Sequence, residues 1–190
     1  MNNNLSDNAL IPVRNMVNHK VVYKIPDQNR RIEFEPFQER KITAGELRAL
    51  HYTSGGETLL HEFLCVKNDI LREEFNIPKD QIEYDWELKD IKHILLDESN
   101  NTLIASLQDA LDFAPEGIRD MIIDYAVIWK IPDTNRRKII TQMTGIDINK
   151  QIEFSELVET TTEGDNTPTQ RRVKANTPSK TGRRVIVKES

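Results

Sequence analysis

Apolar and polar residues alternate in the first part of the chain, and this period of two indicates β-structure. Val21–Ile25 and Arg31–Phe34 are rich in β-branched and aromatic residues, and in the second run Ile32 and Phe34 alternate with glutamates. Residues 26–29, Pro-Asp-Gln-Asn, carry turn chemistry, because proline presets φ and Asp or Asn side chains bond back to the chain. The two runs therefore predict a β-hairpin with one buried face.

A helical period replaces this alternation from Thr43 onward. Thr43–Glu46 fits a capping box, in which the threonine side chain accepts from the Glu46 amide and the glutamate reaches back. Arg40–Ile42, just before it, could supply a short third strand. Apolar side chains then recur at helical spacing over successive stretches: Leu59–Leu64, Ile70–Phe75, Leu88–Leu95, Leu103–Leu111, Ile118–Trp129, Ile139–Met143 and Ile152–Leu157.

Particular residues mark where these helices are expected to begin and end. Asp85, Asp133 and Asp147 are candidate N-caps, and Pro115 occupies a favoured first-turn position. Gly145 is a candidate C-terminal stop, because glycine adopts the left-handed conformation that often ends a helix. The predicted fold class is therefore α+β, with a small N-terminal β-hairpin or β-sheet unit followed by a mostly α-helical body and an extended C-terminal tail.

The composition shifts along the chain and predicts its organisation. Residues 1–10 are polar and Asn-rich, which is typical of a flexible arm. Residues 11–80 should hold the hairpin with its helices, and residues 81–158 a helical domain. From about residue 159 the apolar period fails and Thr, Gly and Pro accumulate, so 159–190 is expected to be a linker and a basic extended tail.

Charge is divided unevenly between the body and the tail. The whole chain has a net charge of −5, but residues 167–190 hold seven basic residues against one acidic, a net charge of +6, which leaves −11 on residues 1–166. Such a division predicts an anionic partner for the tail, or docking of the tail on an acidic protein surface. A role in solubility alone is the alternative interpretation.

The tail repeats itself loosely, because an Asn-Thr-Pro triplet precedes an Arg-Arg-Val triplet twice. Its Val185–Val187 segment has strong strand propensity and could add to the edge of a partner's sheet. No aromatic residue is interleaved with the basic ones, so contacts with nucleic acid would be electrostatic and independent of sequence. The predicted partner-binding residues are Arg171, Arg172, Lys174, Arg183, Arg184, Val185, Ile186 and Val187.

A nine-residue segment occurs twice, as YKIPDQNRR at 23–31 and WKIPDTNRR at 129–137. Each copy could present a pair of arginines on a rigid turn that grips phosphates or carboxylates, through Arg30 and Arg31 or through Arg136 and Arg137. The simpler interpretation, which we favour, is that Ile-Pro-Asp-x-Asn is a good turn. The flanking patterns are strand-like in the first copy and helical in the second, which argues against duplication of a whole domain.

Residues with catalytic or metal-binding potential are sparse. His61 and Cys65 lie four apart on a predicted helix and could share one face, but two ligands do not make a metal site. The sequence contains no phosphate-binding glycine loop, no nucleophile elbow and no His-Glu-x-x-His motif. The carboxylates look like solvated helix faces, with no buried partner to change a pKa. We therefore expect no catalytic site, no metal, no cofactor and no small-molecule substrate.

The cysteine count, the apolar runs and the N-terminus indicate the cellular compartment in which we expect the protein. Cys65 is the only cysteine and cannot form an internal disulfide, which favours a reducing environment. No apolar run is long enough to cross a bilayer, and the N-terminus lacks the basic and apolar regions of a signal peptide. We expect neither a membrane partner nor secretion by a signal peptide.

Three segments, IPVRNMVNHKVVYKIPDQNRRIEF, LDFAPEGIRDMIIDYAV and NRRKIITQMTGIDI, resemble stretches of proteins encoded by tailed bacteriophages. The resemblance spans roughly residues 11–150 and brings no catalytic residue with it. It implies a virion or accessory protein, located in the virion or the host cytoplasm. The expected function is a non-enzymatic structural or assembly protein that binds other protein subunits through its basic extension. The alternatives are a nucleic-acid-associated accessory protein, acting through the tail, and a regulatory module that binds a host protein.

Overall fold

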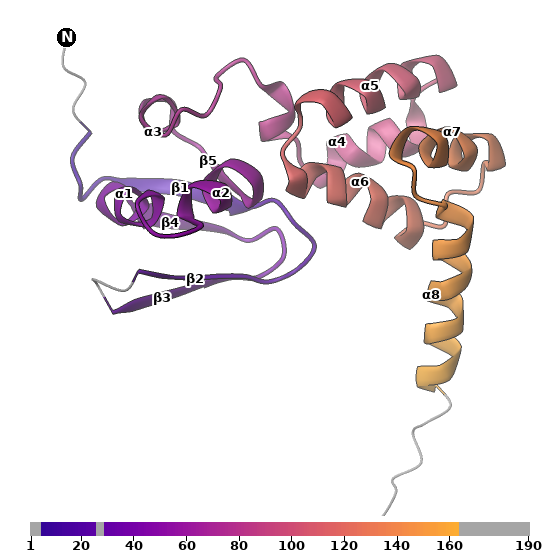
Figure 1. The fold of residues 1–190 in the computed structure, drawn as a ribbon, viewed down its shortest axis with the longest axis horizontal. Coiled ribbons are helices and arrows are strands. Elements are labelled where there is room, and N and C mark those ends of the chain that lie inside the picture. The colour runs from indigo at the N-terminus through magenta and orange to yellow at the C-terminus, as the bar shows by residue number, and fades with distance from the viewer. Residues whose placement is uncertain (1–4, 26–28, 164–190) are drawn as a thin grey trace, which may run out of the picture.

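The central strand of the protein is β1 (Leu10–Asn15), which lies between β4 (Glu39–Thr43) and β5 (Leu64–Val66) in a three-stranded antiparallel sheet. This computed structural model describes residues 5–25 and 29–163. The sheet lies in the N-terminal part and the longer helices in the C-terminal part (Figure 1). The predicted α+β class is therefore confirmed. Of the linker and basic tail predicted for 159–190, residues 164–190 lie outside the described residues, and with them all the tail residues expected to bind partners.

The predicted hairpin is confirmed as a separate two-stranded sheet. β2 (Val21–Ile25) pairs antiparallel with β3 (Arg30–Phe34), and the residues along β2 alternate between buried and exposed. The expected turn residues 26–28 lie outside the described residues, and Asn29 beyond them has a left-handed backbone with φ 47°. Arg40–Ile42 does form a strand, but as part of β4 it pairs with β1 and not with the hairpin.

The side chain of Asn15 joins the turns on either side of the hairpin. It is fully buried, and its amide donates to the carbonyls of His19 at 2.8 Å and Glu35 at 2.9 Å. Its oxygen accepts from the amide of Val17 at 3.0 Å. A buried amide costs free energy unless its donors and acceptor are used, and here all are used. The connections from β1 to β2 and from β3 to β4 are therefore held together.

A tight connection follows the first helix. α1 (Ala44–His51) begins with the predicted Thr43–Glu46 capping box, which the structure confirms. After it come α2 (Gly56–Thr58) and the π-helix η2 (Leu59–Phe63). Gly56 packs so closely under α1 that a Cβ atom there would lie 1.7 Å from the Leu50 carbonyl oxygen. The end of α1 and the start of α2 are thereby held at the closest approach that a backbone allows.

The rest of the described chain is helical. The elements are α3 (Asp69–Glu74), the 3-10 helix η3 (Ile82–Asp85), α4 (Leu88–Lys92), the π-helix η4 (His93–Asp97), α5 (Asn100–Phe113), α6 (Glu116–Ile128), α7 (Thr134–Thr144) and α8 (Ile148–Glu163). Buried apolar side chains from the sheet and from these helices form one continuous core. Among the described residues, no helix combines the length and apolar character needed to span a membrane.

Most predicted helix ends are confirmed, and the exceptions have physical reasons. Asp133 accepts from the Asn135 amide at 2.7 Å, Asp147 from the Lys150 amide at 3.2 Å, and Gly145 ends α7 with φ 73°. Asp85 does not cap α4, which begins after Glu87, because the Asp85 carboxylate is bound by an arginine from α3. The predicted end of structure near residue 159 is also wrong, since α8 continues to Glu163.

The apolar pattern misassigned residues in two places, in β5 and on α8. Leu64 was expected in a helix, but it begins β5, whose three residues are all buried. Phe154 and Leu157 were expected inside, yet they are 65% and 66% exposed on α8. In Figure 1 α8 extends out from the helical body, so only the first part of this helix has a core to pack against.

We expect Gly56→Ala to lower the free energy of unfolding by about 1–3 kcal/mol, because the new methyl group would force the backbone of Leu50 to move. Chemical denaturation monitored by circular dichroism would measure the change. Ser54→Ala, at an exposed position in the same connection, is the matched control and should leave stability nearly unchanged. Equal stabilities of the Gly56→Ala protein and the control would contradict the packing argument.

Candidate functional site

An acidic groove of about 570 Å³ lies between the segment that leads into η3 and the C-terminal half of α5. Ile82 and Phe113 are apolar side chains in its lining, and they are 72% and 62% exposed. The lining contains four carboxylates and no basic side chain. Its residues are Pro78, Asp80, Gln81, Ile82, Glu83, Asp109, Asp112 and Phe113.

The negative charge of this groove is not compensated locally. Within the described residues, none of its four carboxylates forms an ion pair, although Asp112 accepts a hydrogen bond from Gln108 at 2.8 Å. Glu83 as a whole residue is 7% exposed, and its carboxylate has no cation beside it among the described residues. Asp109 and Asp112 are three apart on α5, a spacing at which like charges repel. The helix dipole adds to the effect, because the last turn of α5 contains no basic residue.

One hydrogen bond joins the two walls of the groove. The side-chain amide of Gln81 donates to the carbonyl of Phe113, the last residue of α5. The carbonyls of the last helical turn lack partners within the helix, so this bond satisfies one of them. The distance between the η3 segment and the end of α5 is thereby fixed, and with it the width of the groove.

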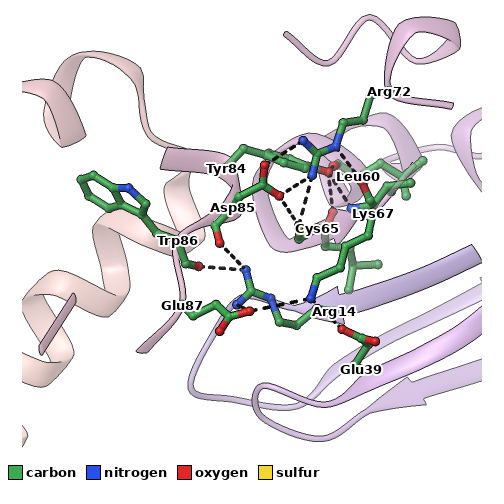
Figure 2. A network of polar contacts seen from close by, with 12 residues as sticks. Arg14, Glu39, Leu60, Cys65, Lys67, Arg72, Tyr84, Asp85, Trp86 and Glu87 are labelled. Carbon is green, nitrogen blue, oxygen red and sulfur yellow. Dashed lines mark hydrogen bonds and ion pairs between the residues drawn. The ribbon is translucent and has the colours of Figure 1, made fainter. Parts of the chain in front are cut away.

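A buried arginine holds the η3 wall of the groove in place (Figure 2). Arg72 of α3 is 6% exposed, and its guanidinium donates to both carboxylate oxygens of Asp85, at 2.9 Å from Nη1 and through a second bond from Nη2. Its Nε donates to the carbonyl of Val66 in β5 at 2.7 Å. The same guanidinium lies 4.7 Å from the centre of the Tyr84 ring. The charge is therefore surrounded by acceptors and by an aromatic face.

Tyr84 connects the same wall to the sheet. Its side chain is fully buried, and its hydroxyl accepts from the Val66 amide at 3.0 Å. The hydroxyl also lies 2.8 Å from the carbonyls of Leu60 and Leu64, either of which can accept its proton. These groups lie at the junction of η2 and β5, so the hydroxyl replaces ladder bonds that such a short strand cannot make.

Arg14 of β1 completes the connection from the opposite side (Figure 2). It donates to the carbonyls of Asp85 at 3.2 Å and Trp86 at 2.8 Å, and its Nη1 lies 3.3 Å from a carboxylate oxygen of Glu87. Arg14 and Arg72 together bind the chain where it passes from the sheet region into the helical body. Sequence reasoning expected no carboxylate with a buried partner, and the Arg72–Asp85 pair overturns that expectation.

The electrostatics of this joint make Cys65 a poor nucleophile. Hydrogen bonds from Arg72 hold the pKa of Asp85 below its ordinary value. Burial raises the pKa of the Cys65 thiol, whose sulfur lies 3.5 Å from a carboxylate oxygen of Asp85. The thiol therefore stays protonated, and a protonated thiol is unreactive. Cys65 also lies on β5 while His61 lies on η2, so the predicted shared helix face does not form.

A separate group of three side chains, which includes His61, could hold a metal ion. One nitrogen each from His51 and His61 and one carboxylate oxygen from Glu57 lie within 4.8 Å of one another. Sequence reasoning missed this group because it paired His61 with Cys65. The signal that could have found it is the glycine pair Gly55-Gly56, which lets the chain turn back between His51 and Glu57.

The arginines of the repeated segment are engaged within the chain, and the two copies differ in backbone. Arg30 pairs with Glu46 and Arg31 with Glu33, both on the hairpin side of the molecule. Asn29 in the first copy and Lys130 in the second have left-handed backbones, so the turn comes at different places in the repeat. The same letters therefore form a hairpin in one context and a connection between helices in the other.

In the second copy both arginines are partly buried. Arg136 donates to the carbonyls of Leu95, at 2.9 Å, and Glu98, and so caps the end of η4. Arg137 bonds the Thr134 hydroxyl at 3.4 Å, and its Nε is buried without a hydrogen-bond partner among the described residues. Arg136 is therefore not presented to a partner by the turn, since its side chain is 13% exposed.

Comparison of the chain with known protein families, with curated proteins and with solved structures found no match.

We expect Asp85→Asn to lower the free energy of unfolding by about 1–3 kcal/mol at neutral pH, because the guanidinium of Arg72 would stay buried without its counterion. Asp85 itself is 52% exposed at the side chain, so water compensates part of the loss. Urea denaturation of both proteins at several pH values would measure it.

The difference between the two proteins should depend on pH in one direction. The folded pKa of Asp85 is depressed, so its contribution is present above the ordinary aspartate pKa of about 3.9 and is lost as the pH falls through the folded value. The gap should therefore narrow at acid pH. Asp97→Asn, at an exposed aspartate beside His93, is the matched control. A gap that stays constant from pH 7 to pH 3 would contradict the ion-pair argument.

Proposed function

We propose that this chain is a non-enzymatic assembly protein whose basic C-terminal tail docks in the acidic groove of a neighbouring copy. The observation that carries the proposal is the uncompensated charge of the groove, where four carboxylates surround two exposed apolar side chains. A cationic segment with an apolar centre would relieve the repulsion and cover the apolar surface.

The sequence of the tail offers such a segment. In residues 183–188, Arg-Arg-Val-Ile-Val-Lys, three basic side chains flank three apolar ones. The arginines would bind Asp109 and Asp112, and the valines and isoleucine would cover Ile82 and Phe113. Arginine suits this role because its guanidinium can donate two parallel bonds to one carboxylate.

The position of α8 supports docking between copies. α8 leads the chain out of the helical body, and in Figure 1 it runs away from α5, whose last residues line the groove. The groove and the tail that would fill it are separated along the chain by α6, α7 and α8. A contact of this kind joins one copy to the next and is repeated along an assembly.

We place this assembly in the particle of a tailed bacteriophage, on the strength of the resemblance of the three segments given above. The expected observation is detection of the chain, by mass spectrometry, among the proteins of purified particles. Its absence from particles made by cells that express it would remove the virion context. The contact between tail and groove could still be tested on the purified protein.

The net charge of +6 on residues 167–190 also favours a second function, in which the tail binds nucleic acid without regard to sequence. A gel shift with the full chain and with a chain ending at residue 166 would detect it. Binding of this kind should fall steeply between low and moderate salt. Strong binding of nucleic acid by a protein that does not self-associate would favour this second function over the first.

We expect two charge-reversed proteins to lose self-association at low salt, Asp109→Lys/Asp112→Lys in the groove and Arg183→Glu/Arg184→Glu in the tail. Each should weaken the association by about tenfold, since paired charges become like charges. An equimolar mixture should associate again, because each altered surface then meets its complement. Sedimentation velocity over a range of concentrations would measure all three.

The matched control is Asp120→Lys/Asp124→Lys, which makes the same change in net charge on α6. It should associate as the unaltered protein does. Loss of association in the control, or no recovery in the mixture, would show that net charge and not the groove governs the behaviour. A protein that stays monomeric while its tail contacts its own groove would also overturn the proposal.

A further inference from the structure

Two histidines and a glutamate come together on the side of the sheet region where α1 ends. His51 is the last residue of α1, Glu57 lies on α2, and His61 on η2. The potential ligand atoms of the three lie within 4.8 Å of one another, and both histidines are half-buried while Glu57 is exposed. These residues belong neither to the acidic groove nor to the Arg72–Asp85 joint.

The fold holds the three residues close for reasons already present in the backbone. Gly55 takes a left-handed conformation with φ 79°, and Gly56 packs against the carbonyl of Leu50. This turn brings Glu57 back beside His51. His61 then follows in the π-helix η2, and π-helical turns within helices are frequent at functional sites. The group is therefore positioned by tight local structure and not by long mobile loops.

The tautomer of the neutral His61 ring is set by a hydrogen bond. Its Nε2 lies 2.8 Å from the carbonyl oxygen of Phe75, which can only accept, so Nε2 carries the hydrogen. In the neutral ring Nδ1 then has a free lone pair. Histidines that bind metals usually donate their other ring hydrogen to a carbonyl or carboxylate, and this bond orients the ring.

His51 brings a ring held in one orientation and a nitrogen without a partner. The ring stacks on that of Phe75, with the two centres 4.8 Å apart and the planes 13° from parallel. Its Nε2 is shielded from solvent and has no hydrogen-bond partner among the described residues. A buried ring nitrogen without a partner costs free energy, and an ion bound at that nitrogen would offset the cost. Phe75 therefore supports both histidines, one through its ring and the other through its carbonyl.

We propose that His51, Glu57 and His61 bind one divalent transition-metal ion, with Zn²⁺ as the occupant that their chemistry fits best. Two imidazole nitrogens and one carboxylate oxygen form a ligand set that zinc accepts in proteins, with a fourth position left for water or for another ligand. Tetrahedral zinc with bonds of about 2.0–2.1 Å needs its ligand atoms roughly 3.3 Å apart. The group must therefore contract on binding, and the exposed side chain of Glu57 is free to move inward.

The proposal is tested with the untagged full-length protein, first treated with a chelator and then titrated with ZnCl₂ by isothermal calorimetry. One Zn²⁺ should bind per chain, and Co²⁺ in its place should give the visible absorption of a low-coordinate site. Glu57→Gln should weaken the affinity by about tenfold or more, and His61→Gln by a larger factor. Glu57 is exposed, so its variant should fold even if a histidine variant does not.

His93→Gln is the matched control, because His93 is 65% exposed at its side chain and lies outside the group. It should bind Zn²⁺ as the unaltered protein does. Nitrogen NMR of the histidine rings should show Zn²⁺ shifting Nδ1 of His61 while Nε2 keeps its hydrogen. Equal affinities for the unaltered protein and Glu57→Gln, or an equal loss in His93→Gln, would overturn the site. Neither result would bear on the assembly function, which uses other residues.

Discussion

The buried guanidinium of Arg72 is the interaction on which the arrangement of the whole molecule depends. A charge removed from water is tolerated only where hydrogen bonds and a counterion replace the lost solvation. Asp85, the carbonyl of Val66 and the ring of Tyr84 together supply that replacement. Because these partners come from a strand and from η3, satisfying one side chain joins the sheet region to the start of the helical body. η3 forms one wall of the groove, so the joint that holds η3 also sets the position of that wall.

The carboxylates of the joint and those of the groove differ in their partners. Both contain carboxylates at partly covered positions, and in the joint each charge has a partner at short distance. In the groove Glu83 and the other carboxylates have no cation beside them among the described residues, although η3 contributes to both places. Asp85 is paired with Arg72, whereas Glu83, two residues earlier, has no cation beside it among the described residues. The ion pair of Asp85 stabilises the fold, whereas the like charges of the groove repel one another.

Patterns of sequence predicted the hairpin, the capping box and most helices, because each depends on residues close together in the chain. β1 and β5 were missed because a central strand and a three-residue buried strand show no alternation that distinguishes them from other apolar runs. The acidic groove and the group of His51, Glu57 and His61 could not be predicted either. Each brings together residues from separate elements, and only the tertiary fold decides which charges become neighbours.

The repeated segment also shows that local sequence alone does not determine tertiary contacts. Nine residues that agree almost letter for letter form a hairpin at one place and join two helices at another. Local chemistry supplied a turn in both cases, and the flanking apolar residues decided its kind. The arginines that end each copy consequently have unrelated partners, Glu46 for Arg30 and main-chain carbonyls for Arg136.

Cys65 gives the joint a built-in reporter. It is the only thiol in the chain, it is completely covered, and it lies beside both Arg72 and Asp85. A thiol-specific reagent can reach it only when the structure around it opens locally, so the labelling rate reports how often such opening occurs. The labelling rate of Cys65 in the unaltered protein therefore measures local opening at the joint. Any ligand that stabilises the closed joint should slow the labelling.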